Sequence, residues 1–427
     1  MLAVRLSCKT FHSVTKTQQF WYSRVSQLIK THYVSPPEEN LEEYNVDELE
    51  QWVRRRCRAR DAFADPRLHF NEQTLNLEDY DLLGAERASL NSKLIPGGRW
   101  LLIGHPPAIV HFIDLDSPDP TPRLLFDFSE VDDEIHEVDS EEVESFNFSI
   151  WIDRGSPRLS FRLAFSLLTY VSRIYLSQVD LVGHGANATL VASNIAILRN
   201  PNMEMQPMCT ALNDSYVVQV WNLNGDVSDT RFGVYDYRQA LSCGDYLMSE
   251  SDERPIVVIV FENDMEFIHK DIFAMSDIKS HSLSVYEIGP SASLNLLHRV
   301  DVYTPLWSTV RWTPGASILI MMDVDRTELR GVVIPHDSKN PPTIVVLGRC
   351  NGGKSSEYRL GTRAFVVEGK VHEIFSYDWD FHSPVNHERT LTSRRVDFSA
   401  YLLPFDEDIG RFLAYTSEMQ LVINDII

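Results

Sequence analysis

The sequence predicts a mainly β fold: a β-propeller of about seven blades, preceded by a small α-helical head. From about Leu94 to the C-terminus, apolar and polar residues alternate in short runs, and Gly, Pro, Asp, Asn and Ser separate these runs. No long stretch of helical periodicity interrupts them. Residues 94–427 also exceed the usual length of a sandwich or barrel, and at roughly 45 residues per blade they provide about seven blades.

The first 63 residues are expected to form the helical head. Residues 2–14 carry apolar side chains at helical spacing, and "QQFWYSRVSQLI" (18–29) does so again. The segment "SPPEEN" (35–40) is a helix breaker and linker. A third helix is expected in "NVDELEQWVRRRCRARDAF" (45–63), where Asn45 can cap and Glu48 takes the capping-box position. The predicted domains are therefore 1–63 and 90–427.

A run of arginines stands near the end of the third predicted helix. Basic runs invite a nucleic-acid or localisation hypothesis, but acidic residues from Glu42 to Glu50 precede this one. Positive charge also suits a helix C-terminus. The favoured interpretation is a solvated helix face made by Arg54, Arg55, Arg56, Arg58 and Arg60.

Within the β region, four segments place an aromatic or apolar residue before Asp, Asn or Glu near a strand end. This is where a WD-type blade carries its dipeptide. The spacing between the segments is irregular, so it does not determine the number of blades. The four segments are "VHFIDLD", "VQVWNL", "LSVYEIG" and "IFSYDW".

Composition restricts the classes of partner and compartment. The chain has 39 basic and 61 acidic residues and a formal net charge of −22, which disfavours nucleic acid and anionic membranes as partners. Its five cysteines lie far apart without a CxxC pair, which indicates neither a zinc site nor a disulfide framework. No signal peptide and no apolar run of membrane-spanning length is recognised. The expected location is cytoplasmic or nuclear.

One segment matches a nucleotide-binding motif. In "GRCNGGKS", Gly348, Gly353, Lys354 and Ser355 satisfy GxxxxGK[ST], whose backbone amides, lysine and serine hold phosphates and magnesium. That site also needs a helix directly after the motif. Only "SSEYRLGTR" separates the motif from the next predicted strand. A Gly-rich hairpin loop is therefore favoured, and no cofactor is expected.

Catalytic motifs of the hydrolase families are not found. The sequence has no GxSxG nucleophile elbow and no HExxH zinc motif, so neither an enzyme nor a metal site is predicted. His184, between two glycines in "DLVGHGANATL", is either a catalytic base or a turn residue, and the turn is favoured. The acidic segment Asp127–Glu144 is expected to form a mobile loop between blades, and capture of a basic partner is its alternative role.

The first 22 residues resemble the second half of an F-box. The likeness lies in a Leu-rich helix, a "CK.F" turn and a closing Trp. The residues that carry it are Leu2, Val4, Leu6, Cys8, Lys9, Phe11, Val14 and Trp21. The remainder is similar to fungal F-box proteins with a propeller-like C-terminal region. This second likeness rests on "IPGGRWLLIG" and on "LLPFDEDIGRFLAYTSEMQLVINDI", which is similar to a last blade.

The resemblance implies a non-enzymatic, substrate-recognition subunit of an SCF-type, cullin-based ubiquitin ligase. The head would bind a Skp-type adaptor and the propeller an unknown target protein. The residues implied in adaptor binding are Leu2, Leu6, Cys8, Phe11 and Trp21.

The Leu-Pro pair and amphipathic helix that begin an F-box are not found ahead of these residues. A truncated gene model is the favoured explanation, and an isoform without ligase recruitment or a degenerate box are the others. The half module is expected to bind the adaptor weakly or not at all. Two other functions stay open: a propeller scaffold without a ligase link and, less favoured, a propeller hydrolase.

Overall fold

In the computed structural model, twenty-five segments of the chain are described, and the structural statements below concern these segments. They are residues 8–32, 34–64, 69–77, 91–105, 108–128, 145–168, 172–199, 205–223, 226–242, 245–247, 253–255, 265–277, 281–289, 292–302, 306–307, 310–322, 328–349, 357–360, 364–368, 372–377, 379, 391, 393–396, 401–416 and 420–426.

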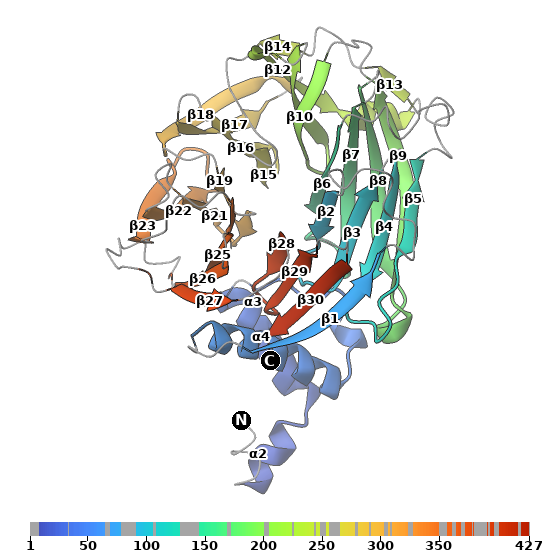
Figure 1. Cartoon of the computed structure of the whole chain (residues 1–427), viewed down its shortest axis with the longest axis vertical. Coiled ribbons are helices and arrows are strands. Elements are labelled where there is room, and N and C mark those ends of the chain that lie inside the picture. The colour runs from blue at the N-terminus through green and yellow to red at the C-terminus, as the bar shows by residue number, and fades with distance from the viewer. Residues whose placement is uncertain are drawn as a thin grey trace.

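Over these segments the β region forms seven sheets arranged as a ring (Figure 1). The first contains β2 (Asn91–Leu94), β3 (Trp100–His105), β4 (Ile109–Asp114) and β5 (Arg123–Asp127). The second contains β6 (Ser145–Ile152), β7 (Ser160–Leu168), β8 (Ser172–Val182) and β9 (Thr189–Arg199), with β13 (Asp245–Leu247) added parallel to β9. The third contains β10 (Met205–Leu212), β11 (Tyr216–Leu223), β12 (Asp226–Asp236) and β14 (Glu253–Pro255).

The remaining sheets continue round the ring in chain order. The fourth contains β15 (Met265–His269), β16 (Ile272–Asp277), β17 (Ser282–Ile288) and β18 (Leu294–Asp301). The fifth contains β19 (Leu306–Trp307), β20 (Arg311–Trp312), β21 (Ala316–Met322), β22 (Glu328–Pro335) and β23 (Thr343–Arg349). The sixth contains β24 (Glu357–Leu360), β25 (Ala364–Glu368), β26 (His372–Ser376) and β27 (Ser393–Val396).

The seventh sheet joins the two ends of the chain. It contains β28 (Tyr401–Asp406), β29 (Arg411–Tyr415), β30 (Gln420–Ile426) and β1 (Phe70–Asn76), and β1 pairs antiparallel with β30 from Phe70↔Ile426 to Asn76↔Gln420. The sequence "FNEQTLN" is mostly polar and does not predict a strand here. This strand lies between the two predicted domains and belongs to the propeller.

Neighbouring sheets share apolar cores, and these cores close the ring. Each core contains buried side chains from two successive sheets, which is how sheets without a second layer bury their apolar faces. In ring order, the shared pairs include Phe112 and Phe165, Leu176 and Trp221, Val220 and Phe267, Leu283 and Leu319, Ile320 and Phe375, Ile374 and Phe412, and Leu413 and Leu101. The prediction of a mainly β, propeller-type fold is confirmed.

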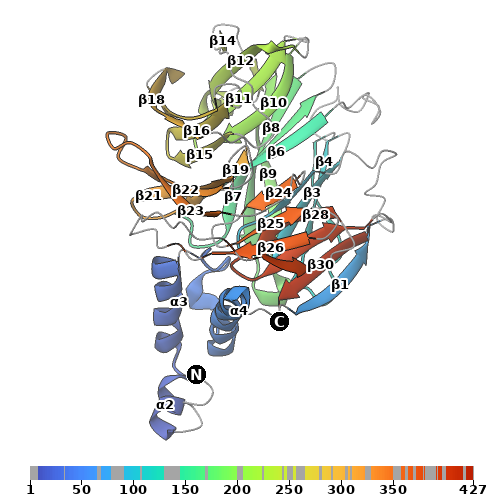
Figure 2. The ribbon, with the colours of Figure 1, turned by 60° about the vertical axis from the view of Figure 1, so that its left-hand side comes forward.

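The head consists of α2 (Lys9–Val14), α3 (Gln18–His32) and α4 (Val46–Ala64), with a 3-10 turn η1 (Leu41–Glu43) in the linker. The helices predicted over 18–29 and 45–63 are confirmed. Asn45 Oδ1 accepts from the amides of Asp47 and Glu48, and Glu48 Oε2 accepts from the Asn45 amide, which completes the capping box. Figure 2 shows α3 and α4 against one side of the ring and α2 at the far end of the head.

The head has its own apolar core, built between α3 and α4. Its fully buried members come from both helices and from the linker, and they include Trp21, Val25, Leu28, Val34, Leu49 and Val53. No helix in the segments described is long and apolar enough to cross a membrane.

Candidate functional site

The junction between head and propeller is the first candidate site. The linker between α3 and α4 runs across turns of three sheets. The Ser35 amide donates to Asp408 Oδ2 (2.7 Å) in the β28–β29 turn, and Glu38 O accepts from the Leu159 amide before β7. Glu39 reaches the β2–β3 turn. The head is therefore attached to the seventh, first and second sheets.

Arg99 is at the centre of this junction. Its guanidinium donates to both carboxylate oxygens of Asp114 (3.0 and 2.8 Å), to Glu39 Oε1 (3.1 Å) and to Gly185 O (2.8 Å). The side chains of Arg99, Asp114 and Glu39 are 12%, 5% and 2% exposed. Burial of the ions strengthens each hydrogen bond and makes loss of any partner costly.

The tight β2–β3 turn brings Arg99 to this position. Gly98 has φ +73°, and a Cβ there would lie 2.3 Å from Ile409 Cδ1 of the β28–β29 turn. The Gly97 amide donates to Oδ2 of Asp406 (2.9 Å), the last residue of β28 before that turn. Glycine permits both the left-handed backbone and the close approach of the two turns. The "PGG" before Arg99 thus has a structural reason.

A second ionic group fixes α4 to the propeller. Arg55 Nη1 lies 2.9 Å from Asp116 Oδ1, and Arg411 lies 3.0 Å from the same oxygen. Arg411 also makes a two-point contact with Asp425 (2.6 and 2.7 Å). Two arginines from distant parts of the chain share one carboxylate, so α4 is tied to the first and seventh sheets.

The expectation that the arginine run forms a solvated face is wrong for Arg55 and Arg56. Arg56 is buried, with its guanidinium 3.7 Å from the centre of the Trp52 ring, and burial lowers its pKa against the opposing effect of Asp408. Of the five arginines, Arg58 is exposed. The run alone does not show which side of the helix meets the acidic turns of the propeller.

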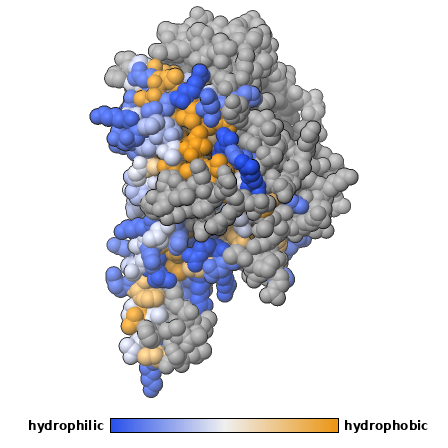
Figure 3. Space-filling model, turned by 90° about the vertical axis from the view of Figure 1, so that its left-hand side faces the viewer, coloured by the Kyte–Doolittle hydropathy of each residue, from blue (hydrophilic) through white to orange (hydrophobic). Residues whose placement is uncertain are grey.

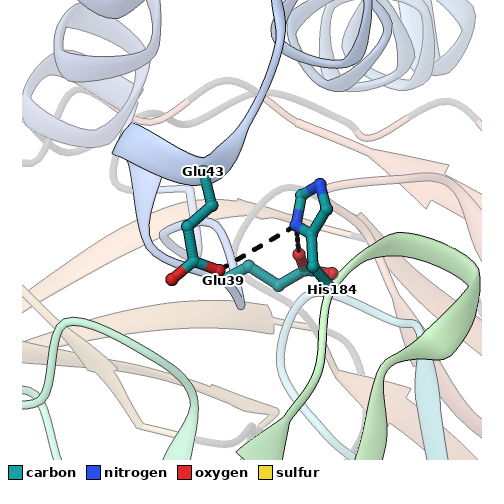
Figure 4. A group of neighbouring side chains, drawn as sticks. All are labelled: Glu39, Glu43 and His184. Atoms are coloured by element: carbon teal, nitrogen blue, oxygen red, sulfur yellow. Dashed lines mark ion pairs between the residues drawn. The ribbon is translucent and has the colours of Figure 1, made fainter.

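A third group lies around His184 (Figure 4). His184 stands in the β8–β9 turn, just before the 3-10 turn η5 (Gly185–Asn187), so the prediction of a turn residue is confirmed. Its Nδ1 contacts Glu39 Oε2 and lies 4.0 Å from Glu43 Oε2, while its Nε2 lies 3.5 Å from Glu48 Oε1. Three glutamates therefore surround one imidazole. Sequence analysis missed this because about 140 residues separate the partners.

Aromatic and basic residues gather where non-neighbouring sheets meet. Trp151 of the second sheet and Trp312 of the fifth sheet touch edge to face, with ring centres 5.2 Å apart. The His269 and His336 rings stack at 4.0 Å, each about 5.4 Å from Trp312. In a ring of seven sheets, the second and the fifth meet only across the centre. We call these four residues, with Arg154, the axial cluster.

The axial cluster contains two histidines that are neutral and one arginine that is cationic. Burial, and next the neighbouring His269, lower the pKa of His336 to about 4, and burial also lowers the pKa of His269. The guanidinium of Arg154 lies 4.7 Å from the Trp312 ring centre. Surrounding protein lowers the pKa of Arg154 to about 10, although its side chain still reaches solvent. Arg154 therefore presents the cationic surface of this cluster.

Of the residues implied in adaptor binding, the structure describes some and not others. Leu2, Leu6 and the side chain of Phe11 lie outside the described residues. Cys8 is half-buried just before α2. Trp21 is buried in the head core and donates its indole N–H to Thr15 O (2.9 Å). Trp21 therefore stabilises the head, and adaptor contact by the other residues stays a prediction.

The remaining sequence motifs lie mostly outside the described segments. Gly348 belongs to β23, whereas Gly353, Lys354 and Ser355 are not described. The next described residue, Glu357, begins strand β24. Residues 129–144 of the acidic segment are also outside the described part.

No family model matches the chain, and no curated protein matches it. Among solved structures, it is similar to the WD40 domain of SCAP from fission yeast, with 9% sequence identity and a TM-score of 0.36. The alignment covers 80% of this chain and 82% of that one. The assignment as a propeller rests on the sheets and their shared cores.

Proposed function

We propose that this chain is a protein-interaction receptor whose head binds an adaptor and whose propeller binds a target protein. In its specific form, the proposal is a substrate-recognition subunit of an SCF-type ubiquitin ligase. The observation that carries it is the attachment of the head by buried ion pairs, centred on Arg99, with α2 at the far end from the ring. Such a receptor needs a fixed distance and orientation between adaptor and target.

The far end of the head supports an adaptor contact. Val14, at the end of α2, is 46% exposed, and Cys8 at its start is half-buried. Figure 3 shows hydrophobic residues beside hydrophilic ones at this tip. Val14 is therefore accessible to a partner that binds this tip. It is also the segment that resembles an F-box.

We place target binding at the axial cluster. Arg154 is exposed, contacts Trp312, and makes no ion pair within the described segments. A partner carboxylate would gain a charge-assisted contact there. A photo-crosslinking residue at the adjacent exposed position Gly155, which leaves Arg154 in place, is expected to capture a protein that the same residue at Val191 does not. Equal capture from both positions would reject this location.

A second candidate function is a propeller scaffold without a ligase link. The burial of Trp21 favours it, because the residue that ends the F-box-like segment is fully used in the core of the head. In this case the head serves only to cover the turns of three sheets.

Measuring capture of a Skp-type adaptor distinguishes the two functions. Because the half module is expected to bind weakly, a Leu-Pro amphipathic helix is first added ahead of residue 1. This extended chain is compared with its Val14→Asp variant and with its Val191→Asp variant, a control of similar exposure (50%) on strand β9. We expect Val14→Asp to reduce capture at least tenfold, because it puts a charge into an apolar contact, and Val191→Asp to leave it unchanged. If the adaptor is captured by none of the chains, or equally by all, the ligase link is rejected.

A further inference from the structure

We propose that Glu39, Glu43 and His184 form a binding site for a divalent transition-metal ion, Zn²⁺ foremost, which joins the head to the propeller. The site is independent of the function proposed above. Its residues come from two elements: both glutamates from the linker and the histidine from the β8–β9 turn (Figure 4). A bound ion would therefore connect segments that are far apart in the chain.

The positions of the ligand atoms fit one ion. One nitrogen of His184 and one oxygen each of Glu39 and Glu43 lie within 4.8 Å of one another. Ligand atoms around a single tetrahedral zinc ion are roughly 3.3 Å apart, given bonds of about 2.0–2.2 Å. Glu43 and His184 are both partly exposed, so small side-chain rotations suffice to bring the three atoms to that spacing.

The environment of the imidazole is the second observation. His184 Nδ1 is buried from solvent, contacts Glu39 Oε2 and lies 4.0 Å from Glu43 Oε2, so this nitrogen faces two carboxylates. On the other side of the ring, Nε2 lies 3.5 Å from Glu48 Oε1. A carboxylate beside one ring nitrogen favours the proton at that nitrogen and leaves a lone pair on the other. This is the usual arrangement of a metal-binding histidine.

The surrounding charges also favour a cation. Glu39 is oriented by Arg99 and by the Gly185 amide (3.1 Å), and Glu43 by Arg158 (3.2 Å). The Arg99 guanidinium already donates two hydrogen bonds to Asp114, so Asp114 and Glu39 share its positive charge. The group therefore has two more carboxylates than guanidinium groups, counting Glu39, Glu43, Glu48 and Asp114 against Arg99 and Arg158. A divalent ion balances this excess.

The donor set selects the type of metal. One imidazole and two carboxylates suit zinc and its first-row neighbours, with a water molecule as the fourth ligand. Magnesium and calcium prefer sites made of oxygen alone. We therefore expect zinc to bind and magnesium not to compete with it.

The test is a calorimetric titration of the full, metal-stripped chain with ZnCl₂, together with elemental analysis of the dialysed protein. We expect one ion per chain, and at least tenfold weaker binding for His184→Gln and for Glu43→Gln. Glu48→Gln, which removes one carboxylate beside the ring but keeps an amide oxygen that can cap α4, is expected to weaken binding about tenfold. His69→Gln, at an exposed histidine before β1, is the matched control and should bind as the parent does.

Circular dichroism and thermal denaturation establish that each variant is folded. Glu43 is partly exposed and keeps its shape as glutamine, so this variant tests the site even if His184→Gln loosens the turn. The proposal is overturned if the parent chain binds no zinc at micromolar concentration. It is equally overturned if the folded Glu43→Gln and His184→Gln variants bind zinc as tightly as the parent.

Discussion

Replacing Arg99 with methionine removes the cation at the centre of the head–propeller junction while keeping an unbranched side chain that fills part of the same space. The guanidinium makes four hydrogen bonds, two to Asp114 and one each to Glu39 and Gly185 O. Both carboxylates are almost completely buried, so water cannot replace the lost partner. Two buried negative charges would lose the cation that they share.

The expected loss follows from this burial. Breaking a buried ion pair by removing one partner costs about 3–5 kcal/mol, because the remaining charge stays desolvated. Arg99 has two ionic partners, so we expect a decrease in the free energy of unfolding of at least about 3 kcal/mol. An exposed pair of the same chemistry contributes about 0–1 kcal/mol.

The matched control is Arg238→Met. Arg238 makes a two-point contact with Asp236 at 2.7 Å, like that of Arg99 with Asp114, but half of its side chain is exposed. Both variants are measured by urea denaturation, followed by tryptophan fluorescence. Because a chain of this length need not unfold in one step, proteolysis of the linker 34–45 under native conditions is measured as well.

The linker should be cleaved faster in Arg99→Met, because the linker loses its main attachment. Arg238→Met should show neither effect. If the two variants lose the same stability within about 1 kcal/mol, and if linker cleavage is unchanged, the buried ion pairs do not hold the head in place.

Two further predictions concern packing and pH. A Cβ on Gly331 would lie 2.3 Å from the buried Trp379 ring. Gly331→Ala should therefore lower the free energy of unfolding by about 1–3 kcal/mol, measured by thermal or urea denaturation. Gly315→Ala is the control and should cause no measurable loss, because no atom lies within 4 Å of a Cβ there. Equal stability of the two variants would contradict the packing at Trp379. Burial raises the pKa of Glu38 from 4.5 to about 8, so the folded chain keeps a proton that the unfolded chain releases. This contribution to stability is complete below about pH 4.5 and decreases as the pH rises to about 8. Glu38→Gln should therefore reduce the loss of stability between pH 5 and 8, as measured by urea denaturation. Glu42→Gln, which is exposed in the same linker, is the control and should not change this loss. If stability depends on pH in the same way in both variants, Glu38 is not the group responsible.

Local patterns were sufficient to predict the class of the fold. Alternation with a period of two follows from strands that bury one face, and it is visible wherever a strand contains its own apolar residues. Asn45 and Glu48 predicted the start of α4, because a capping box involves residues only three apart. Strand β1 was missed, because its pairing partner β30 lies some 350 residues away and "FNEQTLN" has little alternation of its own.

The candidate sites depend on contacts that no local pattern contains. The arginine run of α4 looked like a solvated face, and only the packed structure brings Arg55 to Asp116 and buries Arg56. His184 was predicted to be a turn residue, which is correct, but its three glutamate neighbours lie about 140 residues earlier. A closed ring brings together residues that the chain keeps apart. The spacing of residues encodes which face of a strand or helix is buried, whereas the partner that covers this face is chosen when the sheets and the head pack.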